Sequence, residues 1–114
     1  MKIIRSPISL THLQVLAAAR FGNLIKAVVD IEKGVVAIDA DLHADLEAAL
    51  LAAGSKQENL WGINLYPDFF GKDDFIEFDS MINLRPSLNN PSRGVDDPNV
   101  RKKIITIISR LITP

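Results

Sequence analysis

Two β-branched segments joined by a short turn constrain the fold of this chain more than any other feature. Residues 26–31 and 35–39 are rich in Val and Ile, and Glu32, Lys33 and Gly34 lie between them. Such a pair of segments with a Gly-containing connection is typical of a β-hairpin, in which Gly34 supplies a positive φ. The chain is therefore expected to contain antiparallel strands against which its other segments pack.

Three other segments show the helical spacing of apolar residues. The first is predicted at 10–21, with Ser9 as its N-cap, and the second at 39–53. The third begins at Asp97 and Pro98, because an N-cap Asp followed by proline at the first helical position is a strong start signal. Its apolar residues form a broad face that continues to the end of the chain.

Three more strands are predicted, at residues 1–5, 60–66 and 75–85. The resulting order is β-α-β-β-α-β-β-α, with hairpins between several strands. This order predicts a single α+β domain over residues 1–114, in which three helices cover one face of a mainly antiparallel sheet. Polar side chains on the other face would then be exposed and would need another explanation.

Composition excludes several classes of protein. The chain has 114 residues, no Cys, 13 Lys+Arg and 14 Asp+Glu. Without Cys it has no thiol nucleophile, thiolate zinc site or disulfide. No stretch is apolar enough to span a bilayer or to act as a signal peptide, so we expect a cytoplasmic protein without membrane contact. The near-neutral charge argues against a nucleic-acid binder, and a solvated helix face explains the cluster Arg101, Lys102 and Lys103.

The first candidate site lies near the start of the second predicted helix. His43 and Glu47 are four residues apart, so a helix places them on one face. An imidazole beside a carboxylate can transfer protons or bind a metal ion, and Asp79 is an alternative carboxylate partner. A solvated helix face would use the same residues. A small metal-dependent or acid/base enzyme therefore remains one alternative, with no metal ligands assigned.

The second candidate site is the polar face of the hairpin predicted for residues 60–85. Its symmetric register pairs Asn64 with Glu77 and Gly62 with Asp79, and keeps the apolar residues of both strands on the opposite face. Gly62 then leaves open space above Asp79. The polar face would coordinate a cation or a polar ligand, or it would be an ordinary solvated surface. Its members are Asn64, Glu77, Asp79, Asn83 and Arg85.

The third candidate site is the segment that follows this hairpin. Two guanidinium groups, hydroxyls and amides within ten residues could form a cradle for an anion. The same composition is also typical of a connector whose Asn and Ser side chains bond to their own backbone. The residues concerned are Arg85, Asn90, Ser92 and Arg93.

An aromatic cluster is predicted at the end of the hairpin. Tyr66 and Phe75 lie on its outer face, and Phe69 and Phe70 are in the loop between its strands. A monomer would hardly leave such a cluster in water. We therefore expect a homodimer contact here, unless the loop folds over the sheet.

Three sequence blocks resemble a known family. They are Leu42-His-Ala-Asp-x-Glu47, Gly54-Ser-x-Gln57-x-x-Leu60-Trp-Gly-Ile-Asn64-x-Tyr-Pro67, and Phe75-Ile-Glu-Phe-Asp-Ser-Met-Ile-Asn83-x-Arg-Pro86 with Asn90-x-Ser-Arg93. The chain resembles, nearly from end to end, a family of short bacterial and archaeal proteins catalogued as a domain of unknown function. That resemblance implies no particular activity, substrate or cofactor.

The leading hypothesis is a pocket between the second helix, the 60–85 hairpin and the 86–94 loop. We expect it to bind a small polar or anionic ligand, and the sequence leaves any cofactor unknown. The alternatives are the enzyme based on His43 and a homodimeric module for protein interaction. The side chains expected to hold the ligand are Asn64, Asn83, Arg85 and Arg93.

Overall fold

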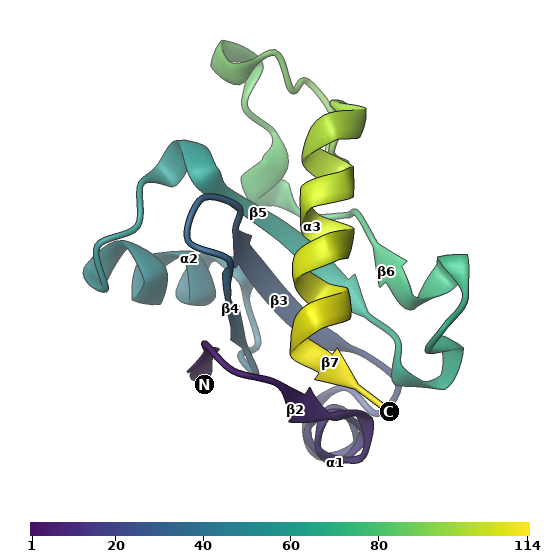
Figure 1. Cartoon of the computed structure of the whole chain (residues 1–114). Helices are drawn as coiled ribbons and strands as arrows, with labels where there is room; N and C mark the ends of the chain where they lie inside the picture. The colour runs from purple at the N-terminus through teal and green to yellow at the C-terminus, as the bar shows by residue number, and fades with distance from the viewer.

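A five-stranded antiparallel sheet with helices on both faces forms the centre of the structure, a computed structural model that describes residues 1–114 (Figure 1). The strand order is β1-β4-β3-β5-β6. The strands are β1 (Lys2–Ile4), β3 (Ile25–Asp30), β4 (Val35–Ile38), β5 (Leu60–Leu65) and β6 (Ile76–Glu77). Two further short strands, β2 (Ile8–Ser9) and β7 (Ile112–Thr113), pair in parallel.

Three α-helices and several short 3₁₀ helices complete the structure. The α-helices are α1 (Leu10–Arg20), α2 (His43–Ala52) and α3 (Pro98–Leu111). The 3₁₀ helices are η1 (Gln57–Asn59), η2 (Pro67–Phe69), η3 (Asp73–Phe75), η4 (Met81–Asn83) and η5 (Pro86–Leu88). The α+β class, the three helices and the mainly antiparallel sheet are confirmed. No helix has both the length and the apolar character needed to cross a membrane.

The locally encoded features agree with the prediction. Strands β3 and β4 form the expected hairpin, and Gly34 has a φ of 68°. The Ser9 hydroxyl accepts a hydrogen bond from the backbone N–H of His12, and the Asp97 carboxylate accepts one from that of Asn99. Both helix starts are therefore capped by the predicted residues.

Helices cover both faces of the sheet, which corrects the predicted one-sided arrangement. Helices α1 and α3 pack on one face, and α2 packs on the other against Val28, Ala37 and Leu60. The reason is visible in β3, where consecutive apolar residues point to opposite faces and all need cover. The outer face of β5, with Gly62 and Asn64, therefore faces α2 rather than solvent.

The second helix begins four residues later than predicted. Asp39 has a φ of 71° and cannot belong to a helix, and neither Asp39 nor Asp41 caps α2. Both carboxylates instead accept hydrogen bonds from the guanidinium of Arg20. The helix starts at His43 without a side-chain cap, so its first-turn N–H groups have no partner from a capping side chain.

The predicted strand at residues 75–85 is wrong beyond Glu77. The pairs Asn64–Glu77 and Leu65–Ile76 form as expected, but no strand pairing continues past them. The Ser80 hydroxyl accepts from the backbone N–H of Ile82, and a 3₁₀ turn follows. Ser80 and Ile82 fill the space next to Gly62, where an added Cβ would lie 2.5 Å from Ser80 Cβ. The predicted open space above Gly62 is therefore absent.

The aromatic loop folds back on its own molecule. Phe75 is buried, and its ring meets that of Phe70 edge-on with centroids 5.2 Å apart. Phe69 remains 42% exposed, and the Tyr66 hydroxyl donates to Glu77. Most of the predicted aromatic cluster is therefore in contact with residues of its own chain.

Candidate functional site

A cavity of about 320 Å³ lies where the start of α2 meets the outer face of β5 and the 79–82 segment; we call it the α2 pocket. Two of its polar side chains, His43 and Asn64, are more than nine-tenths buried. They come from different candidate sites of the sequence, and the fold brings them to one wall. The pocket is lined by Lys26, Leu42, His43, Ala44, Asn64, Asp79, Ser80, Met81, Ile82 and Arg93.

His43 presents an unprotonated nitrogen at this pocket. Its Nε2 lies 2.8 Å from the backbone carbonyl of Ile63, and a carbonyl can only accept, so Nε2 carries the proton. Burial lowers the pKa of the imidazole, and the positive charges of Lys26 and Arg93 lower it further. The bond to Ile63 and the charge of Asp79 raise the pKa, but they do not cancel the effect of burial. The ring is therefore neutral, and its Nδ1 is a free acceptor.

Asn64 also has an acceptor atom without a partner. Its Nδ2 donates to Glu77 Oε1 at 2.8 Å and to the backbone carbonyl of Asp79 at 3.4 Å. Both partners only accept, so the orientation of the amide is determined. The buried Oδ1 forms no hydrogen bond within the protein. Native structures rarely leave such an atom unsatisfied without a water or ligand to bond it.

Positive groups lie beside these two acceptors, and Asp79 is the one carboxylate that lines the pocket. The backbone N–H groups of His43 and Ala44 donate to no protein atom, and the start of a helix carries partial positive charge. Lys26 lies opposite Asn64 in the β3–β5 register and lines the same pocket. Arg93 reaches it from the segment after η5, where its Nε donates to Asp79 Oδ1 at 2.7 Å. The pocket thus combines donors and cations suited to an anion.

Asn83 and Asn90 do not reach the α2 pocket, and we call them the amide pair. Asn83 Oδ1 accepts from the Gly62 N–H, and its Nδ2 donates to the carbonyls of Gly62 and Arg93. Asn90 Nδ2 donates to three backbone carbonyls, and its Oδ1 accepts from the Asp96 N–H. The amide pair therefore replaces the missing strand and ties the 80–96 segment to β5.

Arg85 is held by backbone atoms of the chain. Its guanidinium donates to the carbonyls of Gln57 and Leu60 and lies over the Trp61 ring at 4.4 Å. Burial lowers its pKa, and the charge of Glu47 raises it. Glu47 is therefore on the Arg85 side of α2, and no hydrogen bond joins it to His43. Arg85 and Arg93 bind separate parts of the protein.

The other residues predicted for a site bond to neighbouring side chains of the protein. Glu77 Oε1 accepts hydrogen bonds from both Asn64 and Tyr66. Burial of the Tyr66 hydroxyl, together with its bond to Glu77, raises its pKa. Ser92 donates to Asp96. His43, Glu47 and Asp79 do not form a cluster of three side chains that could hold a metal ion, and no such cluster occurs elsewhere.

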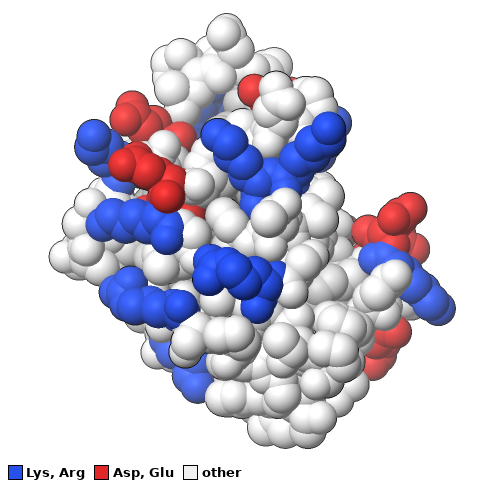
Figure 2. Space-filling view, in the orientation of Figure 1, with Lys and Arg blue, Asp and Glu red and all other residues white.

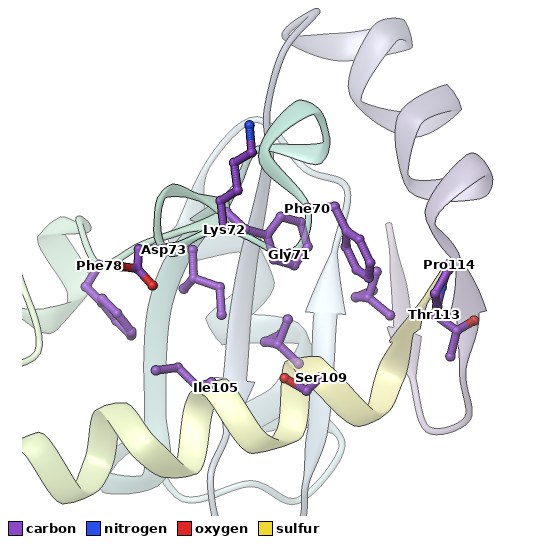
Figure 3. A pocket seen from close by; sticks show the side chains of 13 residues that line it. Phe70, Gly71, Lys72, Asp73, Phe78, Ile105, Ser109, Thr113 and Pro114 are labelled. Carbon is purple, nitrogen blue, oxygen red and sulfur yellow. The ribbon is translucent and has the colours of Figure 1, made fainter.

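A second cavity, the apolar cleft, lies between α3 and the loop after β5 (Figure 3). Its volume is about 400 Å³, and Figure 3 shows Phe70, Phe78 and Ile105 bordering it, with Ser109 on α3. None of the buried polar atoms that lack a partner belongs to a residue of this cleft. The α2 pocket is the stronger candidate site because its polar groups converge.

Comparison with known proteins places the chain in a family. Residues 2–111 match the family described as protein of unknown function (DUF5674). The chain belongs to this family. No curated protein and no solved structure matches the chain. The α2 pocket of this DUF5674 protein therefore has to be interpreted from its own geometry.

Sequence reasoning on this DUF5674 chain missed Lys26 and the free N–H groups of α2. Lys26 is the one charged residue in the apolar segment 24–29. A lone charge in such a segment could have indicated a functional residue. Its position beside Asn64 depends on the β3–β5 pairing, and residue spacing does not determine which strands become neighbours. The periodicity predicts a helix from residue 39, which places the N–H groups of His43 and Ala44 inside the helix rather than at its start.

Proposed function

We propose that the α2 pocket binds a small anion that also carries an O–H or N–H donor. The observation that supports this proposal is a pair of acceptors without a partner in the protein, the buried Asn64 Oδ1 and Nδ1 of the largely buried His43. A ligand donor would satisfy them. The negative charge of the ligand would lie near Lys26, Arg93 and the start of α2, as anions do at helix N-termini.

Glycerol 3-phosphate is a suitable probe because it joins a phosphate to two hydroxyl groups. We expect saturable NMR shifts of the His43 ring and of the His43 and Ala44 amides as the probe is added. Glycerol and inorganic phosphate, titrated separately, should each bind more weakly than the joined molecule, because each engages only one half of the pocket.

A charge variant tests whether the pocket holds the probe. Lys26→Gln should weaken binding by roughly tenfold to a hundredfold, since a hydrogen bond to a charged group contributes roughly 1.5–3 kcal/mol. Lys72→Gln removes the same charge from an exposed position at the apolar cleft and should leave binding unchanged. Shifts that do not saturate, or an equal loss in both variants, would refute the proposal.

A further inference from the structure

The acidic residues of this chain are confined to its middle. All 14 Asp and Glu lie between Asp30 and Asp97, whereas residues 1–29 and 98–114 hold eight of the 13 Lys and Arg and no acid. The overall charge of −1 hides this separation. The C-terminal segment alone holds four of these cations and no acid, so it forms a basic surface if the fold exposes them on one side.

The fold brings the two terminal segments together. Strands β2 and β7 pair with each other, and α1 and α3 cover the same face of the sheet (Figure 1). In the same orientation, Lys and Arg side chains gather over α3, and Asp and Glu appear mainly at the sides of the view (Figure 2). We call the solvent side of α3 the basic face; its cations are Arg101, Lys102, Lys103 and Arg110, and all four come from the C-terminal segment.

No cation of the basic face forms an ion pair with a carboxylate. The four ion pairs of the structure involve only the chain's amino terminus, Arg20 and Arg93. Arg101 and Arg110 donate to backbone carbonyls, which leaves their charge in place. Lys102 and Lys103 are exposed and form no hydrogen bond. Their positive potential is therefore available to a partner.

The chemistry between these cations favours a phosphate backbone over a membrane. A helix that binds a lipid surface inserts its apolar side, but Ile104, Ile107, Ile108 and Leu111 of α3 are buried in the core. Ile105, at the apolar cleft, is the one large apolar side chain of α3 that is exposed. Its outward positions include Asn99, Thr106 and Ser109, which are hydrogen-bond donors suited to phosphate oxygens. No exposed aromatic side chain lies on α3 to stack on an unpaired base.

We propose that the basic face binds the phosphate backbone of double-stranded nucleic acid without reading its sequence. This partner is distinct from the small anion of the α2 pocket, which lies on the opposite side of the sheet. Binding of this kind is governed by counterion release, so its affinity falls steeply as the salt concentration rises.

Fluorescence anisotropy with labelled 20-base-pair DNA and RNA duplexes tests the proposal. At physiological salt we expect a Kd of roughly 1–100 μM that is equal for unrelated sequences, and tighter binding at 50 mM salt. The variant Lys102→Gln/Lys103→Gln should weaken binding about tenfold and reduce the slope of log K against log salt by about 1.8. The variant Lys56→Gln/Lys72→Gln removes the same charge beside Glu58 and Asp73, and it should bind like the unmodified chain.

Three outcomes would overturn this proposal. One is the absence of binding to either duplex at 50 mM salt, and another is an equal loss in both double variants. The third is binding to vesicles of phosphatidylcholine and phosphatidylserine, but not to duplexes, with the same dependence on Lys102 and Lys103. That result would assign the basic face to a lipid surface.

Discussion

Two sets of buried polar side chains lie within the same part of this molecule, and they differ in how completely they are bonded. The amide pair, Asn83 and Asn90, uses its side-chain oxygens and nitrogens on backbone groups. His43 and Asn64 are buried almost as deeply, but each keeps one acceptor without a partner. Burial alone therefore does not mark a functional residue. An atom without a partner does not mark one alone either, because Glu47 Oε2, Trp61 Nε1 and Arg85 Nε are also buried without one. What distinguishes His43 and Asn64 is that both line one cavity with other polar groups.

Removing a member of the amide pair should have the largest effect on stability. Asn83→Ala deletes three hydrogen bonds and leaves the N–H of Gly62 without its partner at a buried position. We expect the free energy of unfolding to fall by about 3–5 kcal/mol, measured by urea denaturation. Asn99→Ala, at an exposed position on α3, is the matched control and should change it by less than about 0.5 kcal/mol. A loss below about 1 kcal/mol for Asn83→Ala would show that the segment does not depend on this amide.

An intermediate effect is expected at Gly62, which lies between the two sets on β5. An Ala side chain would place its Cβ 2.5 Å from Ser80 Cβ and 3.1 Å from Ile82 Cγ1. Gly62→Ala should therefore destabilise the protein by about 2 kcal/mol through overpacking. Adding Ser80→Gly removes the clashing atoms and should restore part of this loss, as a double-mutant cycle by urea denaturation would show. Additive losses would mean that the two residues do not compete for this space.

The sequence predicts what is encoded locally and fails where side chains replace backbone pairing. The β3–β4 hairpin, its turn at Gly34 and the two helix caps follow from neighbouring residues. The 75–85 segment alternates like a strand, but Ser80 and Asn83 use their polar atoms to end the strand and bond to β5. Nothing in the spacing distinguishes an amide that faces solvent from one that takes the place of a strand.

The sequence predicts the residues of the α2 pocket as members of separate sites, because residue spacing does not show which elements pack together. The sequence placed His43 on a helix and Asn64 on a hairpin face, and the alternation of β5 is correct. It could not show that α2 covers this face, because that depends on which side of a two-sided apolar sheet the helix packs. Once α2 lies there, His43, Asn64, Asp79 and Arg93 share one pocket.

The smallest of these effects, a pH dependence, tests whether His43 belongs with the incompletely bonded set. Burial keeps the folded imidazole neutral with a lowered pKa, whereas the unfolded chain has the ordinary value of about 6.5. As the pH falls below 6.5, the unfolded state binds a proton that the folded state does not. Stability should therefore fall by up to about 1.4 kcal/mol per pH unit until the folded pKa is reached.

Urea denaturation at a series of pH values between 7.5 and 5 measures this contribution. The His43→Gln variant should show a shallower fall in the free energy of unfolding than the unmodified chain, since glutamine does not titrate. His12→Gln, which changes the other histidine, on α1, is the comparison variant and should keep the original slope. If His43→Gln and the unmodified chain have the same slope, His43 is not held neutral by burial. Its Nδ1 would then be protonated as readily as in the unfolded chain, and below pH 6.5 the difference between the two sets of buried residues would rest on Asn64 alone.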